Sequence, residues 1–184
     1  MSDIEPGRRG LLLGALVATV SPALLVAAPA AALQESLAPL RRLVGHWRGQ
    51  GQGEPGGSRV ERSYEVVLGG RFLLVRNTST YAPQPANPHG ERHEDLGLIS
   101  FDKARGRAVL RQFHAEGFVN QYVATSADLA AEPLSFESEA IENIPPGWRA
   151  RETYTFAGDT TLLETFELAE PGKDYAVYSR NRLR

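Results

Sequence analysis

The sequence predicts an all-β fold: a single up-and-down antiparallel β-barrel of about ten strands, with a short helix before the first strand. Three observations support this prediction. From about residue 45 to the C-terminus, hydrophobic residues alternate with polar ones in short runs. Turns rich in glycine, proline and aspartate separate these runs at regular intervals. The short connections favour pairing between neighbouring strands, and closing the sheet removes its exposed edges.

The first 32 of the 184 residues have the pattern of an export signal. A polar start containing Arg8 and Arg9 precedes a hydrophobic stretch, which ends in small residues up to Ala32. The two arginines indicate the Tat route, but Gly10-Leu11-Leu12 departs from the usual Tat continuation, so the Sec route stays open. We therefore expect residues 1–32 to be a cleaved signal peptide and residues 33–184 to be the mature barrel domain. That domain would be periplasmic or extracellular, with no stable membrane span after cleavage; the alternative is an uncleaved anchor.

The mature chain begins with a helical pattern and continues with strands only. Leu33, Leu37, Leu40 and Val44 recur at helical spacing. The ten expected strands are 44–50, 59–68, 71–81, 93–101, 107–114, 118–124, 134–140, 148–156, 160–168 and 175–183.

Side chains alternate between the two faces of a strand, so hydrophobic positions indicate which other side chains lie inside. Four strands should carry a charged residue inward in this way. The expected inner sets are Val60, Arg62, Tyr64, Val66 and Leu68; Phe72, Leu74 and Arg76; Trp148, Glu152, Tyr154 and Phe156; and Leu162, Glu164, Phe166 and Leu168. On strand 107–114 both faces are plausible, which leaves the direction of Arg111 open.

Charges inside a barrel are costly unless they are paired. The interior arginines and glutamates therefore form either a self-contained network or a site at which an arginine binds a ligand carboxylate. The residues expected to contact a ligand or support its site are Arg62, Tyr64, Phe72, Leu74, Arg76, Arg111, Trp148, Glu152, Tyr154, Glu164 and Phe166.

Composition excludes several classes of function. The chain has no cysteine, which excludes disulfides and thiolate metal sites, and its net charge of -2 argues against binding to nucleic acid. No hydrolase, nucleotide-binding or zinc-protease motif is present, so no catalytic residue is assigned. An enzyme is not excluded, because the site residues of a barrel come from separate strands, but the sequence favours a binding protein.

No metal site is predicted from the residue spacing. The nearest candidates are His89 and His93, whose spacing suits a metal only on a helix, together with His114 and Tyr178. His89 follows a proline in a loop, so a solvated loop is the expected interpretation. His46 is expected to face away from Trp47 on the first strand.

The run LVGHWRGQGQGEP contains Gly45-x-Trp47, which resembles the start of the first strand in calycins such as lipocalins and fatty-acid-binding proteins. In those barrels an arginine on the last strand packs across the tryptophan, a role the resemblance assigns here to Arg180 or Arg182. The whole mature chain, with LGGRFL at 68–73 and HEDLGLISFD at 93–102, is similar to the nitrobindin-like, haem-binding-like barrel group. A small ligand is the partner that such a fold implies.

The resemblance implies haem as a cofactor, but this chain lacks the histidine that holds haem in the proteins it resembles. Nitrobindin-like proteins hold haem through a histidine on a late strand, whereas the last histidine here is His114 and strand 175–183 offers only Tyr175 and Tyr178. The cofactor is therefore left open. The first hypothesis is an exported barrel that binds a small apolar or amphipathic molecule. The alternatives are haem binding with reactive-nitrogen or peroxide chemistry, and a filled barrel that acts through a partner. The sequence does not fix the oligomeric state.

Overall fold

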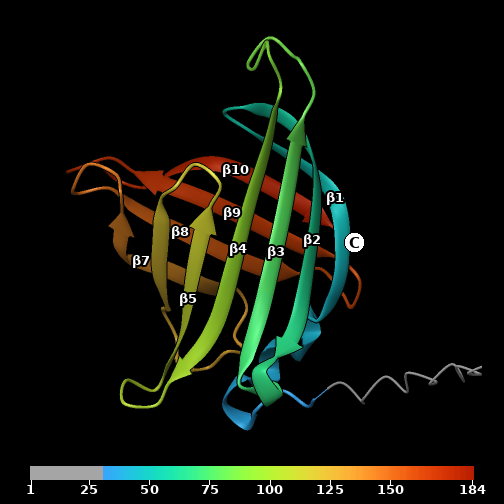
Figure 1. Cartoon of the computed structure of the whole chain (residues 1–184), viewed down its shortest axis with the longest axis vertical. Coiled ribbons are helices and arrows are strands. Elements are labelled where there is room, and N and C mark those ends of the chain that lie inside the picture. The colour runs from blue at the N-terminus through green and yellow to red at the C-terminus, as the bar shows by residue number, and fades with distance from the viewer. Residues whose placement is uncertain (1–30) are drawn as a thin grey trace, which may run out of the picture.

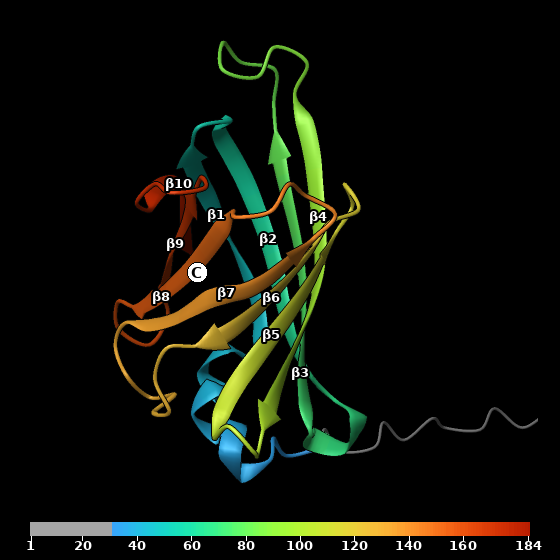
Figure 2. The same cartoon turned by 90° about the vertical axis from the view of Figure 1, so that its left-hand side faces the viewer.

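Ten antiparallel strands close into a barrel in the computed structural model, which describes residues 31–184 (Figures 1 and 2). The strands are β1 (Gly45–Gly53), β2 (Gly56–Val67), β3 (Phe72–Tyr81), β4 (Glu91–Asp102), β5 (Arg107–His114), β6 (Val119–Ala124), β7 (Leu134–Glu142), β8 (Arg149–Phe156), β9 (Leu162–Ala169) and β10 (Ala176–Leu183). Each strand pairs with its neighbours in the chain, and β1 pairs with β10 to close the sheet. The predicted fold class is confirmed. The predicted signal peptide lies outside the described residues except for its last two positions. Among the described residues, no helix is long and apolar enough to cross a membrane.

Glycines in β1 allow the barrel to close. Register pairs join Gly49 to Leu183 and Gly53 to Ser179. A Cβ on Gly49 would lie 1.9 Å from the carbonyl oxygen of Arg182, and a Cβ on Gly53 would lie 2.2 Å from that of Tyr178. Larger residues at these positions would hold β1 and β10 apart, since the obstacle in each case is backbone.

One end of the barrel is closed by a 3-10 helix, η1 (Glu35–Leu43), which contains Pro39. It lies at the lower end of the barrel in Figure 1. Leu37, Leu40 and Leu43 are fully buried there, whereas Val44 is 40% exposed. The expected helical face was therefore wrong at its last position, because η1 turns more tightly than an α-helix and ends at Leu43.

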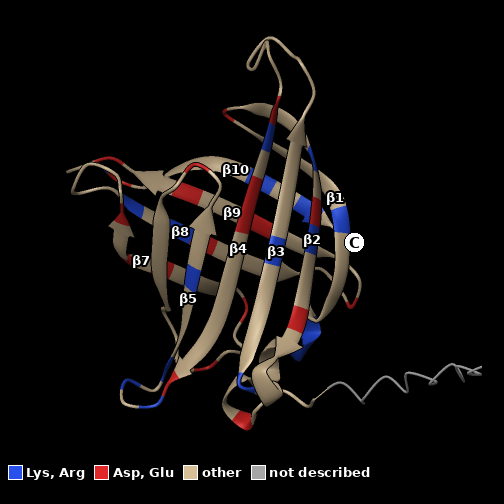
Figure 3. Ribbon diagram, viewed as in Figure 1, with Lys and Arg blue, Asp and Glu red and all other residues tan. Residues whose placement is uncertain are grey.

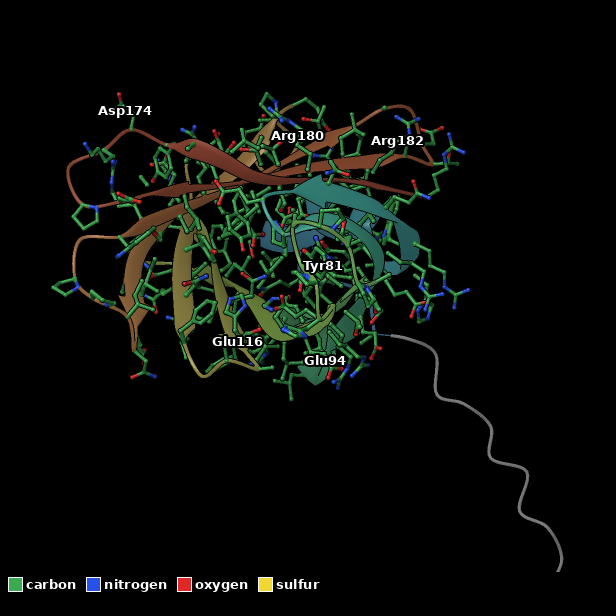
Figure 4. All side chains as sticks on the ribbon, turned by 90° about the horizontal axis from the view of Figure 1, so that it is seen from above. Tyr81, Glu94, Glu116, Asp174, Arg180 and Arg182 are labelled. Atoms are coloured by element: carbon green, nitrogen blue, oxygen red, sulfur yellow. The ribbon has the colours of Figure 1, made fainter. Side chains whose placement is uncertain are left out.

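The calycin-like Trp47 is held by η1 and not by the last strand. Its Nε1 donates a hydrogen bond to the carbonyl oxygen of Leu43 at 2.7 Å, and its ring packs edge-on against Phe156 at 6.1 Å. Arg180 and Arg182 are exposed on the outside of β10 (Figure 4), so neither packs across the tryptophan as the resemblance implied. His46 is exposed and faces away from Trp47, as predicted.

The inner face of β3 differs from the prediction. Leu73, Val75, Asn77 and Ser79 point inward and are buried, so Phe72, Leu74 and Arg76 belong to the outer face. The run from Phe72 to Val75 is hydrophobic on both faces, which is why alternation alone gave the wrong register. Leu68 was also wrongly placed: it is 68% exposed and lies in the short turn η2 (Leu68–Gly70).

Candidate ligand cavity

The barrel is hollow at the end opposite η1, where it encloses a cavity of about 570 Å³. Tyr81 and Glu116 stand at this open end, seen from above in Figure 4. One part of the wall is apolar and consists of Phe118, Ile141, Ile144, Trp148, Phe166 and Leu168. The polar residues of the wall come mainly from β3, β4, β5 and β10. The volume lies in the range of sites for small molecules.

Arg62 on β2 and Glu164 on β9 form a buried ion pair in the cavity wall. Arg62 Nη1 donates to Glu164 Oε1 at 2.6 Å, and the two residues are 7% and 4% exposed. Burial alone would lower the pKa of Arg62, but Glu164, together with Tyr64 and Tyr154, outweighs burial and holds that pKa well above its usual value. Asn181 on β10 donates to the other oxygen of Glu164 at 2.6 Å. The Arg62 guanidinium is therefore charged, and both side chains already have hydrogen-bond partners.

A chain of hydrogen bonds continues from Arg62 to β4 and β5. Arg62 Nε donates to Asn77 Oδ1 at 3.1 Å, and Asn77 Nδ2 donates to Asp95 Oδ2 at 2.8 Å. Gln112 Nε2 donates to Asp95 Oδ1 at 3.3 Å. Burial would raise the pKa of Asp95, but the hydrogen bond from His93 and the charge of Arg62 lower it instead. Asp95 is thus an anion inside the barrel.

Two histidines stand side by side next to Asp95. His93 on β4 has Nδ1 2.7 Å from Glu116 Oε1 and Nε2 3.5 Å from Asp95 Oδ2. His114 on β5 has Nδ1 3.4 Å from His93 Nε2, and its ring stacks on Phe118 at 4.0 Å. The hydrogen bond to Asp95 is the main cause that raises the pKa of His93 to about 9, despite burial. Burial lowers the pKa of His114 to about 4. The pair is therefore one imidazolium and one neutral imidazole.

Glu152 on β8 is the buried acid without a basic partner. It is 4% exposed, and among the described residues it forms no ion pair; Tyr154 donates a hydrogen bond to it. Burial, followed by the charge of Glu164, raises its pKa to about 7. Near neutral pH this carboxyl group can lose or hold a proton in the cavity wall.

The structure brings together several of the residues that the sequence singled out, and separates others. Those at the cavity wall are Arg62, Trp148, Glu152, Glu164, Phe166, His93, His114 and Tyr178. Tyr64 and Tyr154 are buried in the core next to it. Phe72, Leu74 and Arg76 face outward, and so does Arg111, which is exposed and donates to Gln121 at 2.9 Å. His89 is exposed in the loop between β3 and β4, as expected.

Sequence reasoning missed the polar residues that link the charges. Asn77, Asp95, Gln112 and Asn120 are all buried at the cavity wall. Asp95 has the same parity on β4 as His93 and as the buried Gly97 and Ile99. That alternation was the signal which could have found it.

The comparisons with known proteins give a family and a fold. Residues 36–184 match the family model described as "THAP4-like, heme-binding beta-barrel domain". The crystal structure of Rv2717c from M. tuberculosis is similar, with a TM-score of 0.63 and 18% identity over 83% of this chain and 98% of that chain. At this identity the likeness shows the fold alone. No match was found among curated proteins.

The residues of the cavity do not fit the way in which the resemblance implied that haem is held. The last strand contributes Tyr178, Ser179 and Asn181 to the wall and no histidine. Burial raises the pKa of Tyr178, which disfavours the phenolate that would bind iron. The last strand therefore offers haem no ligand of the kind that the resemblance implies.

Proposed function

The chain belongs to the family of THAP4-like, haem-binding β-barrel domains, and from that premise we propose that its cavity binds one small amphipathic molecule. The polar end of this molecule carries hydrogen-bond donors or a positive charge. The apolar part lies against Trp148, Phe166 and their neighbours, and the polar end lies against Glu152.

The balance of charge in the cavity wall carries this proposal. Five acidic residues contribute to the wall: Glu91, Asp95, Glu116, Glu152 and Glu164. Two cations stand among the wall residues: Arg62, which is paired with Glu164, and the His93 imidazolium, which lies between Asp95 and Glu116. Glu91 and Glu152 are left without a basic partner among the described residues. A ligand carboxylate would meet uncompensated acids in a poorly solvated site, whereas an ammonium group would compensate them.

The arginines that the sequence offered for carboxylate capture lie elsewhere. Arg76 and Arg111 are exposed on the outer surface. Figure 3 shows basic and acidic residues distributed over the strands of the barrel. Arg62 is bound to Glu164, Asn77 and, at 3.5 Å, the hydroxyl of Tyr64. Capture of a carboxylate by a free interior arginine therefore has no support in this arrangement.

A matched pair of probes tests the proposal. Dodecylamine and dodecanoate have the same chain length and opposite charge, and both are titrated below their micelle concentrations while tryptophan fluorescence and heat are recorded. We expect the amine to bind at one per chain and at least about 10-fold more tightly than the carboxylate, a difference of about 1.4 kcal/mol. Glu152→Gln should weaken the amine, and Arg76→Gln, on the outer face, should not. Tighter binding of dodecanoate, or binding of neither probe, would overturn the proposal.

Haem is the second candidate, because the family model describes haem-binding domains. Visible absorbance after addition of haem separates the two candidates. A stoichiometric Soret shift that survives His93→Gln and His114→Gln together would require a different ligand, for which Tyr178 at the wall is the nearest. Absence of a shift, together with binding of the amine, would favour the amphipathic ligand.

We also propose that the domain is exported after removal of residues 1–32. Leu33 is 5% exposed and packs in the core, and Gln34 donates from its backbone to the carbonyl oxygen of Gly70 at 2.8 Å. Cleavage after Ala32 would thus leave the packed domain intact. N-terminal sequencing of the protein from the periplasm or medium should find Leu33 or a residue close to it. Retention of Met1 in a membrane fraction would contradict export by cleavage.

A further inference from the structure

Three potential metal ligands converge on the cavity wall where β4 and β5 run side by side. They belong to His93, Asp95 and His114, each of which offers one ligand atom within 4.8 Å of the other two. His93 and Asp95 lie on the inner face of β4, and His114 is the register partner of Asp95 on β5. Pairing of the two strands therefore places the three side chains together without any loop.

The spacing of these atoms suits one tetrahedral ion. Zinc–nitrogen bonds of about 2.0–2.1 Å at the tetrahedral angle place two ligand atoms about 3.3–3.4 Å apart. His93 Nε2 lies 3.4 Å from His114 Nδ1 and 3.5 Å from Asp95 Oδ2. Without a metal the same atoms are held by the hydrogen bonds between them, which a cation would replace.

Each of the three side chains is also held in place by a further residue, which forms a hydrogen bond to it. His93 has Glu116 on its other ring nitrogen at 2.7 Å. Asp95 accepts from Asn77 and Gln112. Such outer partners are typical of metal sites, where a carboxylate or carbonyl fixes the ring of each ligating histidine.

Asn120 supplies the outer partner of His114. Its amide lies 3.2 Å from His114 Nε2, it is 2% exposed, and its Oδ1 has no hydrogen-bond partner among residues 31–184. The oxygen and nitrogen of an amide are assigned from hydrogen bonding. With the oxygen turned to the ring, Asn120 accepts a hydrogen bond from Nε2–H of His114, and the lone pair of Nδ1 is directed at His93 and Asp95.

We propose that His93, Asp95 and His114 bind one divalent transition-metal ion, of which Zn²⁺ is the first to test, with the remaining coordination position facing the cavity. Two imidazoles and one carboxylate are a donor set suited to such ions. The acidic wall around the three ligands favours a cation, and the open position faces the space in which we place the small molecule.

A second group of possible ligands, Glu91, His93 and Glu116, stands at the rim. It shares His93, but its two carboxylates are exposed and it offers only one nitrogen. We assign the site to the inner group, since Asp95 is buried and fixed by two amides.

Titration of the chelator-treated, full-length protein with Zn²⁺, in competition with a chromophoric chelator, tests the site. We expect one ion per chain and a rise in melting temperature on binding. Co²⁺ serves as a spectroscopic probe, because its visible bands are much stronger in four-coordinate than in six-coordinate sites. His114→Gln and Asp95→Asn should each weaken Zn²⁺ by more than 100-fold and remove these bands, and Glu116→Gln, which alters an outer partner, by about 10–100-fold.

The exposed histidines provide matched controls. His46→Gln and His89→Gln should leave stoichiometry and affinity unchanged. Circular dichroism of each variant without metal verifies that it is folded. If His114→Gln does not fold, Asp95→Asn, which retains the shape of the side chain, serves as the test variant. Equal affinity in His114→Gln and the unaltered protein would overturn the site, and so would loss of binding in Glu91→Gln with retention in Asp95→Asn. Failure of the amine to bind would leave this outcome unaffected, because metal and amine are titrated separately.

Discussion

Arg62 on β2 and Glu164 on β9 meet inside the barrel at 2.6 Å, although β1 and β10 lie between their strands in the sheet. The inner face of β1 carries glycine at 49 and 51, so no β1 side chain stands between them at these positions. A Cβ on Gly51 would lie 2.3 Å from Oδ1 of Asn181, the residue that also binds Glu164. The glycines that allow closure of the barrel thus also leave room for its central ion pair.

Breaking this pair should destabilise the protein strongly. Arg62→Met keeps the aliphatic bulk and leaves Glu164 buried without its cation, so we expect the free energy of unfolding to fall by about 3–5 kcal/mol. Glu164→Gln in the same chain should restore part of the loss, because it removes the stranded charge. Urea denaturation of the two single variants and the double variant measures the coupling.

Arg76→Met is the matched control for that cycle. Arg76 is exposed on the outer face of β3, so the free energy of unfolding of the Arg76→Met variant should differ from that of the unaltered protein by no more than about 0.5 kcal/mol. A large loss for Arg76→Met, or additive losses for Arg62→Met and Glu164→Gln, would show that this interpretation of the interior charges is wrong.

Glu152 should make stability depend on pH. Its pKa is raised from 4.5 to about 7 by burial and by the charge of Glu164, with Asp95 adding to the rise and Arg62 and Tyr154 opposing it. The folded protein binds this proton more tightly than the unfolded chain does, so stability falls as the pH rises from 4.5 through 7. Above pH 7 the ionised carboxylate costs about 3 kcal/mol.

The variant Glu152→Gln removes that cost. Its stability should exceed that of the unaltered protein by up to about 3 kcal/mol at pH 8 and be close to it at pH 4.5. Urea denaturation at both pH values gives the difference. If Glu152→Gln raised the free energy of unfolding by the same amount at pH 4.5 and at pH 8, ionisation of Glu152 would not be the source of the gain.

A side chain at position 49 should destabilise the protein, because it would disturb the closure of the barrel. The Cβ of Gly49→Ala would lie 1.9 Å from the backbone oxygen of Arg182, so β1 and β10 must separate locally. We expect a loss of about 1–3 kcal/mol or more, as in overpacked cores. Gly57→Ala is the control, because its Cβ would be no closer than 3.4 Å to Gln52 Oε1; thermal melts of the two variants should differ clearly.

Trp47 should matter to stability while the terminal arginines should not. Trp47→Ala loses the packing on Phe156 and the hydrogen bond to Leu43, and should cost about 3–5 kcal/mol. Arg182→Ala, on the outer face of β10, should change the free energy of unfolding by no more than about 0.5 kcal/mol. Chemical denaturation of both variants checks the contrast. A loss of several kcal/mol for Arg182→Ala would restore the role that the calycin resemblance assigned to it.

The sequence by itself determined the all-β class, the number of strands and the inward direction of Arg62, Glu152 and Glu164. These are local properties: turn residues mark where strands end, and alternation on one clearly hydrophobic face fixes its direction. Alternation failed on β3, where Phe72 and Leu74 compete with Leu73 and Val75 for the inner face.

Only the tertiary structure decided which residues meet. Register between β4 and β5 places His114 opposite Asp95, and the ten-strand closure brings Glu164 to Arg62 over 102 positions of the chain. It also left Arg76 and Arg111 outside and gave Trp47 a partner in η1 in place of Arg180 or Arg182. The reason is physical: hydrophobic patterning acts residue by residue, whereas the identity of a side chain's neighbour depends on strand register and barrel closure, which are properties of the whole sheet.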